Sequence, residues 1–399
     1  MRTPVLLVSG QTDTDAVTQV LARDPGTVVV THRFDGHIVM RSIAGIRGVT
    51  ETVLELAHGC VSCTIRDDLL VLLRKLHRRD DVGRIVLHLE PWLEADPICW
   101  AINTVPVRVG PGFVDGPAAR DVQIAGVVSC VDSANWLEQA LGDDELADGR
   151  TVAQVVIGQA EFADVLLVRN PEPEVLSVLR RLAPRARITA RVGRVEQALD
   201  HLEEDARCGR ADNPHGALLA GQPSLAADGR VELVEFNARR PFHPLRLHAA
   251  IDMLLDGVIR TRGRLWLATQ GEQAMWLAMW LESAGGGLRV SAAGKWLAAM
   301  DSVEVQRVDP ERRAFADLMW DYQFGDRHNA MTVLVCGADS REVLDALRGA
   351  LLTDDEMASP ADWDEFDDPF GDWHEDPCEH LSEAEAFLAY GDHNTEGNH

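Results

Sequence analysis

The chain has 399 residues and a formal net charge of −26, with 64 Asp and Glu against 38 Lys and Arg. A hydrophobic share of 46% over this length is typical of a globular protein with room for two domains. The acidic balance argues against direct binding to nucleic acid, because such a surface repels phosphate.

The cellular location is inferred from the apolar runs and the cysteines. No run approaches the roughly 20 apolar residues that cross a bilayer, and the apolar stretch at residues 5–8 is too short for a signal peptide. Seven scattered cysteines favour reduced thiols over a disulfide framework. We therefore expect a cytoplasmic protein that does not associate with membranes.

Residues 1–206 alternate short apolar runs with amphipathic stretches. The apolar runs suit strands that are covered on both faces, and the amphipathic stretches suit helices between them. This order predicts an α/β domain with a doubly wound parallel sheet. Strands are expected at residues 5–9, 27–31, 84–89, 122–131 and 164–168, and helices at 68–78 and 174–182.

The first expected strand runs into Gly10 and then a helix, which is where a phosphate-binding P-loop belongs. That motif needs a second glycine, a lysine for the β- and γ-phosphates, and Ser or Thr for magnesium. Asp15, Ala16 and Val17 stand at these three positions. Carboxylates at Asp13 and Asp15 would repel phosphate. We expect no ordinary nucleotide hydrolysis, and GTP is not an expected cofactor.

A thiol motif follows at residues 58–63, and we predict that it binds zinc. Cys60 and Cys63 have the spacing that brings two sulfurs onto one ion, and His58 adds a nitrogen. One segment supplies at most three ligands, so the site would stay open to water or to a partner's ligand. Two alternatives remain: a pair of buried small residues at a strand–helix junction, or a redox dithiol activated by the following helix.

The second half begins with a linker expected at residues 207–230, which are rich in Gly, Pro, Ala and Asp. A smaller α/β domain is expected over residues 231–353, with strands near 231–236, 263–269 and 331–336 and helices at 243–255 and 340–352. Residues 354–399 hold 16 Asp and Glu and no Lys or Arg, and are expected to form a mobile acidic tail.

Several other residues are candidates for the functional site. His374, Cys378 and His380 form a possible zinc-acquisition cluster in the tail, although incidental residues in an acidic tail explain them as well. Cys130, Cys336 and His88 are expected in the core, and Cys99 is a candidate to approach the thiol motif. Trp and Met recur at helical spacing in residues 275–280, as a core stripe or, if exposed, a partner-binding face.

Three segments resemble the CobW-type metallochaperone family of P-loop GTPases. The thiol segment matches the family's Gly-Cys-x-Cys-Cys-Thr-x-Arg-x-Asp-Leu element, with Ser62 in place of its middle cysteine. The other matches lie at the start and in the body of the family's C-terminal domain. The matching segments are residues 59–69 (GCVSCTIRDDL), 239–247 (RRPFHPLRL), and 257–268 (GVIRTRGRLWLA) with 324–327 (FGDR).

Two further nucleotide elements of that family are altered here. The element Glu-Thr-Ser/Thr-Gly-x-Ala-Asp-Pro appears as EPWLEADP at residues 90–97, and the guanine element Asn-Lys-x-Asp appears as RNPE at residues 169–172. With the altered loop, this combination is similar to a mycobacterial subgroup that recruits a ribosome hibernation factor to ribosomes under zinc limitation.

That resemblance implies a zinc-responsive adaptor whose partners are the hibernation factor and the ribosome, held through the C-terminal domain or the acidic tail. Two alternatives remain open. One is a working GTP-dependent zinc metallochaperone, and the other is a metal-free thiol–disulfide sensor.

Overall fold

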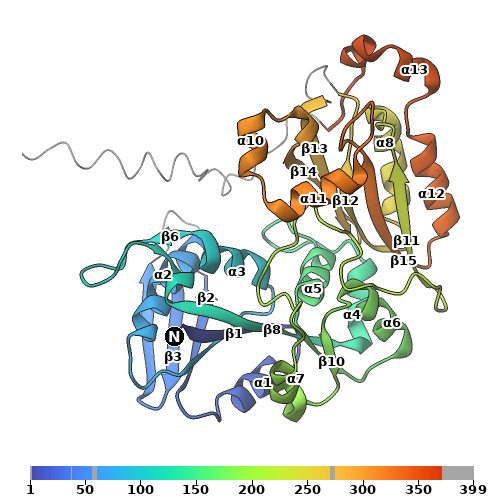
Figure 1. Cartoon of the computed structure of the whole chain (residues 1–399). Helices are drawn as coiled ribbons and strands as arrows, with labels where there is room; N and C mark the ends of the chain where they lie inside the picture. The colour runs from blue at the N-terminus through green and yellow to red at the C-terminus, as the bar shows by residue number, and fades with distance from the viewer. Residues whose placement is uncertain (1, 37, 56–60, 270–274, 371–399) are drawn as a thin grey trace, which may run out of the picture.

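The computed structural model describes residues 2–36, 38–55, 61–269 and 275–370, without the side chains of residues 61–63. Within these residues the N-terminal domain has an eight-stranded sheet in the order β10-β9-β8-β1-β5-β2-β3-β4 (Figure 1). Its strands are β1 (Thr3–Gly10), β2 (Thr27–Asp35), β3 (Ile38–Gly45), β4 (Gly48–Glu55), β5 (Arg84–His88), β8 (Val122–Asp132), β9 (Val165–Arg169) and β10 (Arg187–Thr189).

Helices cover both faces of this sheet because its central strands are apolar on both sides. Along β1, Val5 and Leu7 face one core cluster with α2, while Leu6 and Val8 face another with α1. The helices are α1 (Thr14–Leu21), α2 (Val61–His77), α3 (Ala95–Thr104), α4 (Ser133–Leu141), α5 (Val152–Glu161), α6 (Pro173–Leu182) and α7 (Val195–Asp200). Short elements complete the domain: β6 (Pro106–Val107), β7 (Gly116–Pro117), η2 (Ala118–Arg120) and η3 (Val192–Arg194).

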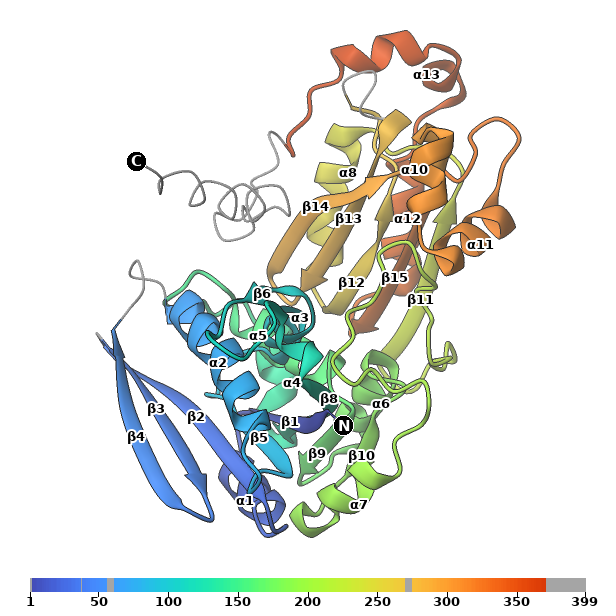
Figure 2. The same ribbon diagram turned by 60° about the vertical axis from the view of Figure 1, so that its left-hand side comes forward.

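The predicted α/β class is confirmed, but the sheet is mixed rather than wholly parallel. The six strands from β10 to β2 run parallel, and β3 and β4 add an antiparallel hairpin at one edge. The sequence does not predict this hairpin, because its strands are only partly buried and lack a continuous apolar run. In Figure 2, β4 is the outermost strand, with β3 between it and β2.

The C-terminal domain has a five-stranded antiparallel sheet in the order β11-β15-β12-β13-β14 among the described residues. Its strands are β11 (Val231–Ala238), β12 (Val258–Leu265), β13 (Leu277–Ala284), β14 (Gly287–Lys295) and β15 (Asn329–Cys336). Its helices are α8 (Pro244–Ala250), η4 (Ile251–Leu254), η5 (Leu297–Ala299), α10 (Ser302–Arg307), α11 (Pro310–Met319) and α12 (Ser340–Gly349).

The helical interpretation is wrong for residues 277–280, which begin β13, whereas Met275 and Trp276 are helical. In the strand Met279 is buried and Trp280 half-buried, while Trp276 just before it is exposed. Alternate residues of a strand face opposite sides, so Met279 reaches the core without a helical stripe.

The two domains share a core and a buried ion cluster. Leu233 and Ile259 of the C-terminal sheet belong to the same apolar cluster as residues of α5 and α6. At the end of α5, the carboxylate of Glu161 lies 3.0 Å from Arg260 Nε and 2.9 Å from Arg262. Burial alone would raise the pKa of Glu161, but the two guanidinium groups outweigh it and hold that pKa below its usual value.

The connecting segment, residues 207–230, contains neither helix nor strand but is packed against the C-terminal sheet. Arg264 on β12 donates to the backbone oxygens of Pro214 and Gly216, both at 2.7 Å. His215 Nε2 lies 2.8 Å from the carbonyl oxygen of Ala293. These contacts fix the segment's path between the domains.

The expectation of a mobile tail from residue 354 is wrong for residues 354–370, which pack on the C-terminal domain. They form α13 (Asp354–Ala358) and η6 (Pro360–Glu365). Arg246 pairs with Glu356 at 2.6 Å, Trp363 is buried beside Trp266, and Phe366 stacks on His243. The remainder of the tail, with the His374, Cys378 and His380 cluster, lies outside the described residues.

Candidate functional site

The altered phosphate loop lies at the carboxyl end of β1. Gly10 has φ +119°, and a Cβ there would come within 2.2 Å of the carbonyl oxygen of Cys130, so only glycine fits. Asp15 is exposed on α1, whereas Val17 is fully buried in the core. The position that would carry the magnesium-binding hydroxyl is therefore part of the apolar core.

The next residue of the loop, Gln11, is tied to the segment after β5. Its Nε2 donates to the carbonyl oxygen of Pro91 at 2.5 Å and to Oε1 of Gln159 at 3.2 Å. Gln159 in turn donates to the carbonyl oxygens of Pro91 and Leu93, at 2.7 and 2.8 Å. Protein amides thus bond to one another beside the loop.

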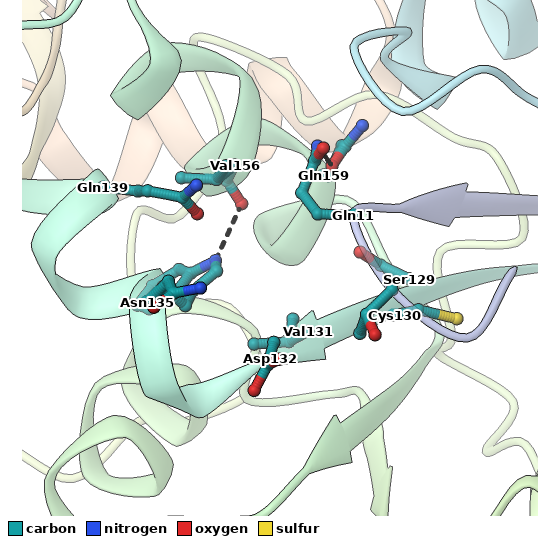
Figure 3. A pocket seen from close by; sticks show the side chains of 11 residues that line it. Gln11, Ser129, Cys130, Val131, Asp132, Asn135, Gln139, Val156 and Gln159 are labelled. Carbon is teal, nitrogen blue, oxygen red and sulfur yellow. Dashed lines mark hydrogen bonds between the residues drawn. The ribbon is translucent and has the colours of Figure 1, made fainter.

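A cavity of about 110 Å³ adjoins these amides (Figure 3). Gln11 and Gln159 lie on one side of it, and Asp132 and Asn135 of the β8–α4 junction on the other. Small-molecule sites usually span about 300–1,000 Å³. The cavity is thus smaller than most small-molecule sites.

The two other altered nucleotide elements also bond to protein groups. In residues 90–97, the carboxylate of Glu90 accepts from the backbone N–H of Phe34 at 3.1 Å, and Glu94 pairs with Arg150 at 2.7 Å. At the end of β9, Arg169 donates to the hydroxyl of Thr12 in the loop at 3.2 Å.

His88 at the end of β5 is half-buried rather than a fully enclosed core residue. Its Nδ1 lies 3.8 Å from Oδ1 of Asp15. Burial lowers the pKa of His88, and the charge of Asp15 opposes that shift.

The thiol motif lies at the start of α2, and the structure describes it in part. His58 and Cys60 lie outside the described residues, while Cys63 falls in the first turn of α2. The helix starts seven residues earlier than the predicted residue 68 (68 − 61). A helix N-terminus favours the thiolate form of a nearby cysteine.

A charged network that the sequence did not reveal anchors the second turn of α2. Asp68 accepts from His32 Nε2 on β2 at 2.8 Å and from Arg41 on β3 at 2.5 Å. Arg41 also donates to the hydroxyl of Thr52 on β4, at 3.1 Å. Asp68 belongs to the motif that resembled the family element, but spacing alone gave no sign of its partners. The network fixes the helix that carries Cys63 against three strands.

The other cysteines that the structure describes are poor metal ligands. Cys99, Cys130 and Cys336 are buried, and Cys208 is half-buried. Burial raises the pKa of each thiol, to about 12 for Cys130, which keeps them protonated at neutral pH. Cys99 packs in the core cluster with Ile124. No group of three His, Cys, Asp or Glu able to hold a metal occurs within the described ranges.

None of the helices in the described ranges combines the length and the apolar character that a membrane crossing requires.

Comparisons with known proteins match both domains. The model of the CobW/HypB/UreG nucleotide-binding domain matches residues 22–172, and that of the cobalamin synthesis protein cobW C-terminal domain matches residues 231–351. The first match begins downstream of the altered loop at residues 10–17.

Two curated relatives align with most of the chain. The zinc chaperone Rv0106 of Mycobacterium tuberculosis is 67% identical over 388 residues, which are 96% of each chain. The zinc-regulated GTPase metalloprotein activator 1 of Dictyostelium discoideum is 26% identical over 345 residues, 80% of this chain and 70% of its own.

Among solved structures, the Zn(II)-bound YjiA GTPase from E. coli aligns with 88% of this chain and 100% of its own, at 13% identity and a TM-score of 0.35, too low to carry an argument. The two family matches and the 67% identity suffice: the chain belongs to the CobW/HypB/UreG family and carries the CobW C-terminal domain.

Proposed function

We propose that this protein is a zinc chaperone that carries zinc on Cys60 and Cys63, with His58 as a further ligand, and passes it to a client protein without hydrolysing nucleotide. Two relatives bear zinc in their names, one as a zinc chaperone and one as a zinc-regulated GTPase. The absence of nucleotide hydrolysis in this proposal is supported by the altered loop. Gln11 is bonded there to the segment after β5, and a buried valine stands where the motif needs the magnesium-binding Ser or Thr.

The donor set suits zinc as cargo. Two thiolates and an imidazole are the ligands that zinc prefers, and three protein ligands leave the fourth position open for exchange. The buried thiols elsewhere in the described chain do not compete for the ion.

The absence of hydrolysis follows from charge and shape at the loop. Ala16 supplies no cation for the β- and γ-phosphates, and Asp13 and Asp15 add negative charge. Bound phosphate would also have to displace the bonds of Gln11 to Pro91 and Gln159.

The test is zinc content and GTP binding, measured on the same reduced samples. Native protein should bind about one zinc per chain and no GTP at micromolar concentrations. The Cys60→Ser/Cys63→Ser variant should lose the zinc, whereas Cys208→Ser, which removes a half-buried thiol outside the motif, should keep it. If the double variant kept as much zinc as the native protein, the proposed site would be refuted. Tight GTP binding would favour a GTP-dependent chaperone, and a reversible Cys60–Cys63 disulfide without zinc would favour a redox sensor.

The acidic tail favours a second proposal, that the protein is also an adaptor that brings a ribosome hibernation factor to ribosomes at low zinc. Residues 354–399 hold sixteen acids and no Lys or Arg, and the eight acids in residues 371–399 suit a basic protein partner. Electrostatic binding of this kind weakens with salt. If deletion of residues 371–399 left the protein's retention on ribosomes unchanged at every salt concentration, the tail would have no part in it.

A further inference from the structure

The hairpin edge of the N-terminal sheet is open to pairing in the part of the chain that the structure describes. β4 pairs with β3 along its whole length, from Gly48 with Gly45 to Glu55 with Ile38, and is the last strand of the sheet. Because hydrogen-bonding groups alternate along an antiparallel strand, every second residue of β4 directs its N–H and C=O away from β3. Figure 2 shows no helix beyond this edge.

Natural sheets usually protect such an edge, and β4 carries two exposed glutamates but none of the other common protective devices. Its sequence, GVTETVLE, contains neither proline nor lysine, and its pairing with β3 shows no bulge. Val49 and Val53 are 67% and 55% exposed, at spacing four on one face.

The charge of β4 indicates which kind of strand would fit there. Glu51 and Glu55 alternate with Val49 and Val53 on that same face, and β4 has no basic residue. Side chains directly opposite one another on paired strands interact. An added strand with apolar and basic side chains at alternate positions of one face would therefore place apolar groups opposite the two valines and cations opposite the two glutamates.

A second copy of the chain fits less well. Antiparallel pairing of two β4 strands places the glutamates of both copies on one face of the joined sheet, without a cation in either strand. Each chain also carries a net charge of −26.

We propose that β4 is a docking edge for an extended segment of a client protein, which pairs as an additional strand and carries alternating apolar and basic residues. Glu55 precedes Cys60 by five residues (60 − 55), so β4 ends shortly before the thiol motif in the sequence. The identification of the partner as a zinc client rests on the proposed function, whereas the pairing itself does not.

The test uses the full-length protein and a synthetic peptide with the repeat Lys-Thr-Val-Thr, which places Lys and Val alternately on one face. A shuffled peptide of identical composition measures non-specific attraction to the acidic chain. Fluorescence anisotropy should show at least fivefold tighter binding of the repeat peptide, and hydrogen exchange should slow at residues 48–55. Equal binding of both peptides, or unchanged exchange in β4, would overturn the proposal.

Variants locate the binding. Glu51→Lys and Val53→Lys should each weaken binding of the repeat peptide at least fivefold. Glu235→Lys should not, because this exposed glutamate lies on β11, an edge strand of the other sheet that α6 and α12 contact. Protection of residues 48–55 that rises with protein concentration in the absence of peptide would overturn the proposal in favour of self-association. Zinc content of the β4 variants, measured separately, distinguishes loss of docking from failure of the zinc site.

Discussion

Replacement of Trp363 by alanine tests whether the first part of the acidic tail belongs to the folded C-terminal domain. The indole is 2% exposed, its N–H donates to the carbonyl oxygen of Glu356 at 2.9 Å, and its ring lies 6.5 Å from that of Trp266. Burial of about 200 Å² of apolar surface stabilises the folded state by about 5 kcal/mol. Large-to-small changes of this kind usually cost about 3–5 kcal/mol.

We therefore expect Trp363→Ala to lower the free energy of unfolding by about 3–5 kcal/mol. At roughly 2 °C per kcal/mol for a large cooperative unit, this is a fall in melting temperature of about 6–10 °C, measurable by calorimetry. Trp276→Ala is the matched control: its side chain is 52% exposed, and the change should cost below about 1 kcal/mol. Equal melting temperatures for the native protein and Trp363→Ala would refute the packed position of residues 354–370.

Three further predictions concern the domain joint, an acid of α3 and the loop. Glu161→Gln should cost about 3 kcal/mol, because Arg260 and Arg262 would lose the buried carboxylate that they share and keep only Glu282 and Asp212 as acidic partners; an unchanged calorimetric transition would contradict this. Asp96 is an exposed residue at the start of α3, and desolvation against its neighbours raises the pKa of its carboxyl group from 3.8 to about 6. The folded state therefore binds this proton more tightly than the unfolded state, and its stability falls as the pH rises from 3.8 through about 6. Asp96→Asn should raise the melting temperature near pH 8, with the gain shrinking towards about pH 4.5; a gain independent of pH would rule out titration of Asp96. Gly10→Ala should cost about 2 kcal/mol or more, since its Cβ has no room at φ +119°; equal denaturation midpoints would show that the loop backbone is free to shift.

The sequence predicted the buried strands well because their signal is local. Residues 84–89 and 122–131 are predominantly apolar, and they correspond to β5 and β8 almost to the residue. The hairpin strands β3 and β4 escaped notice because they lie at an edge, where burial on a single side leaves a weak pattern. Residues 275–280 suggested a helix because Trp and Met recur there at a spacing that suits a helix. The same spacing also occurs at the end of a strand.

The candidate site was predictable only where residues are close in sequence. The altered positions Asp15, Ala16 and Val17 are read directly from motif spacing, and Val17 proves to be a core residue. The partners of Asp68 and Glu161 come from segments far apart in the chain, such as Arg260, 99 residues away from Glu161. Such pairs are set by the fold, and no local spacing encodes them.

The most direct test of the central claim is zinc transfer from the loaded, reduced protein to a chromogenic chelator, with and without GTP and magnesium. The account predicts that the native protein releases about one zinc per chain at a rate that GTP does not change, and that Cys60→Ser/Cys63→Ser releases none. Transfer that requires GTP hydrolysis, or full release from the double variant, would contradict it.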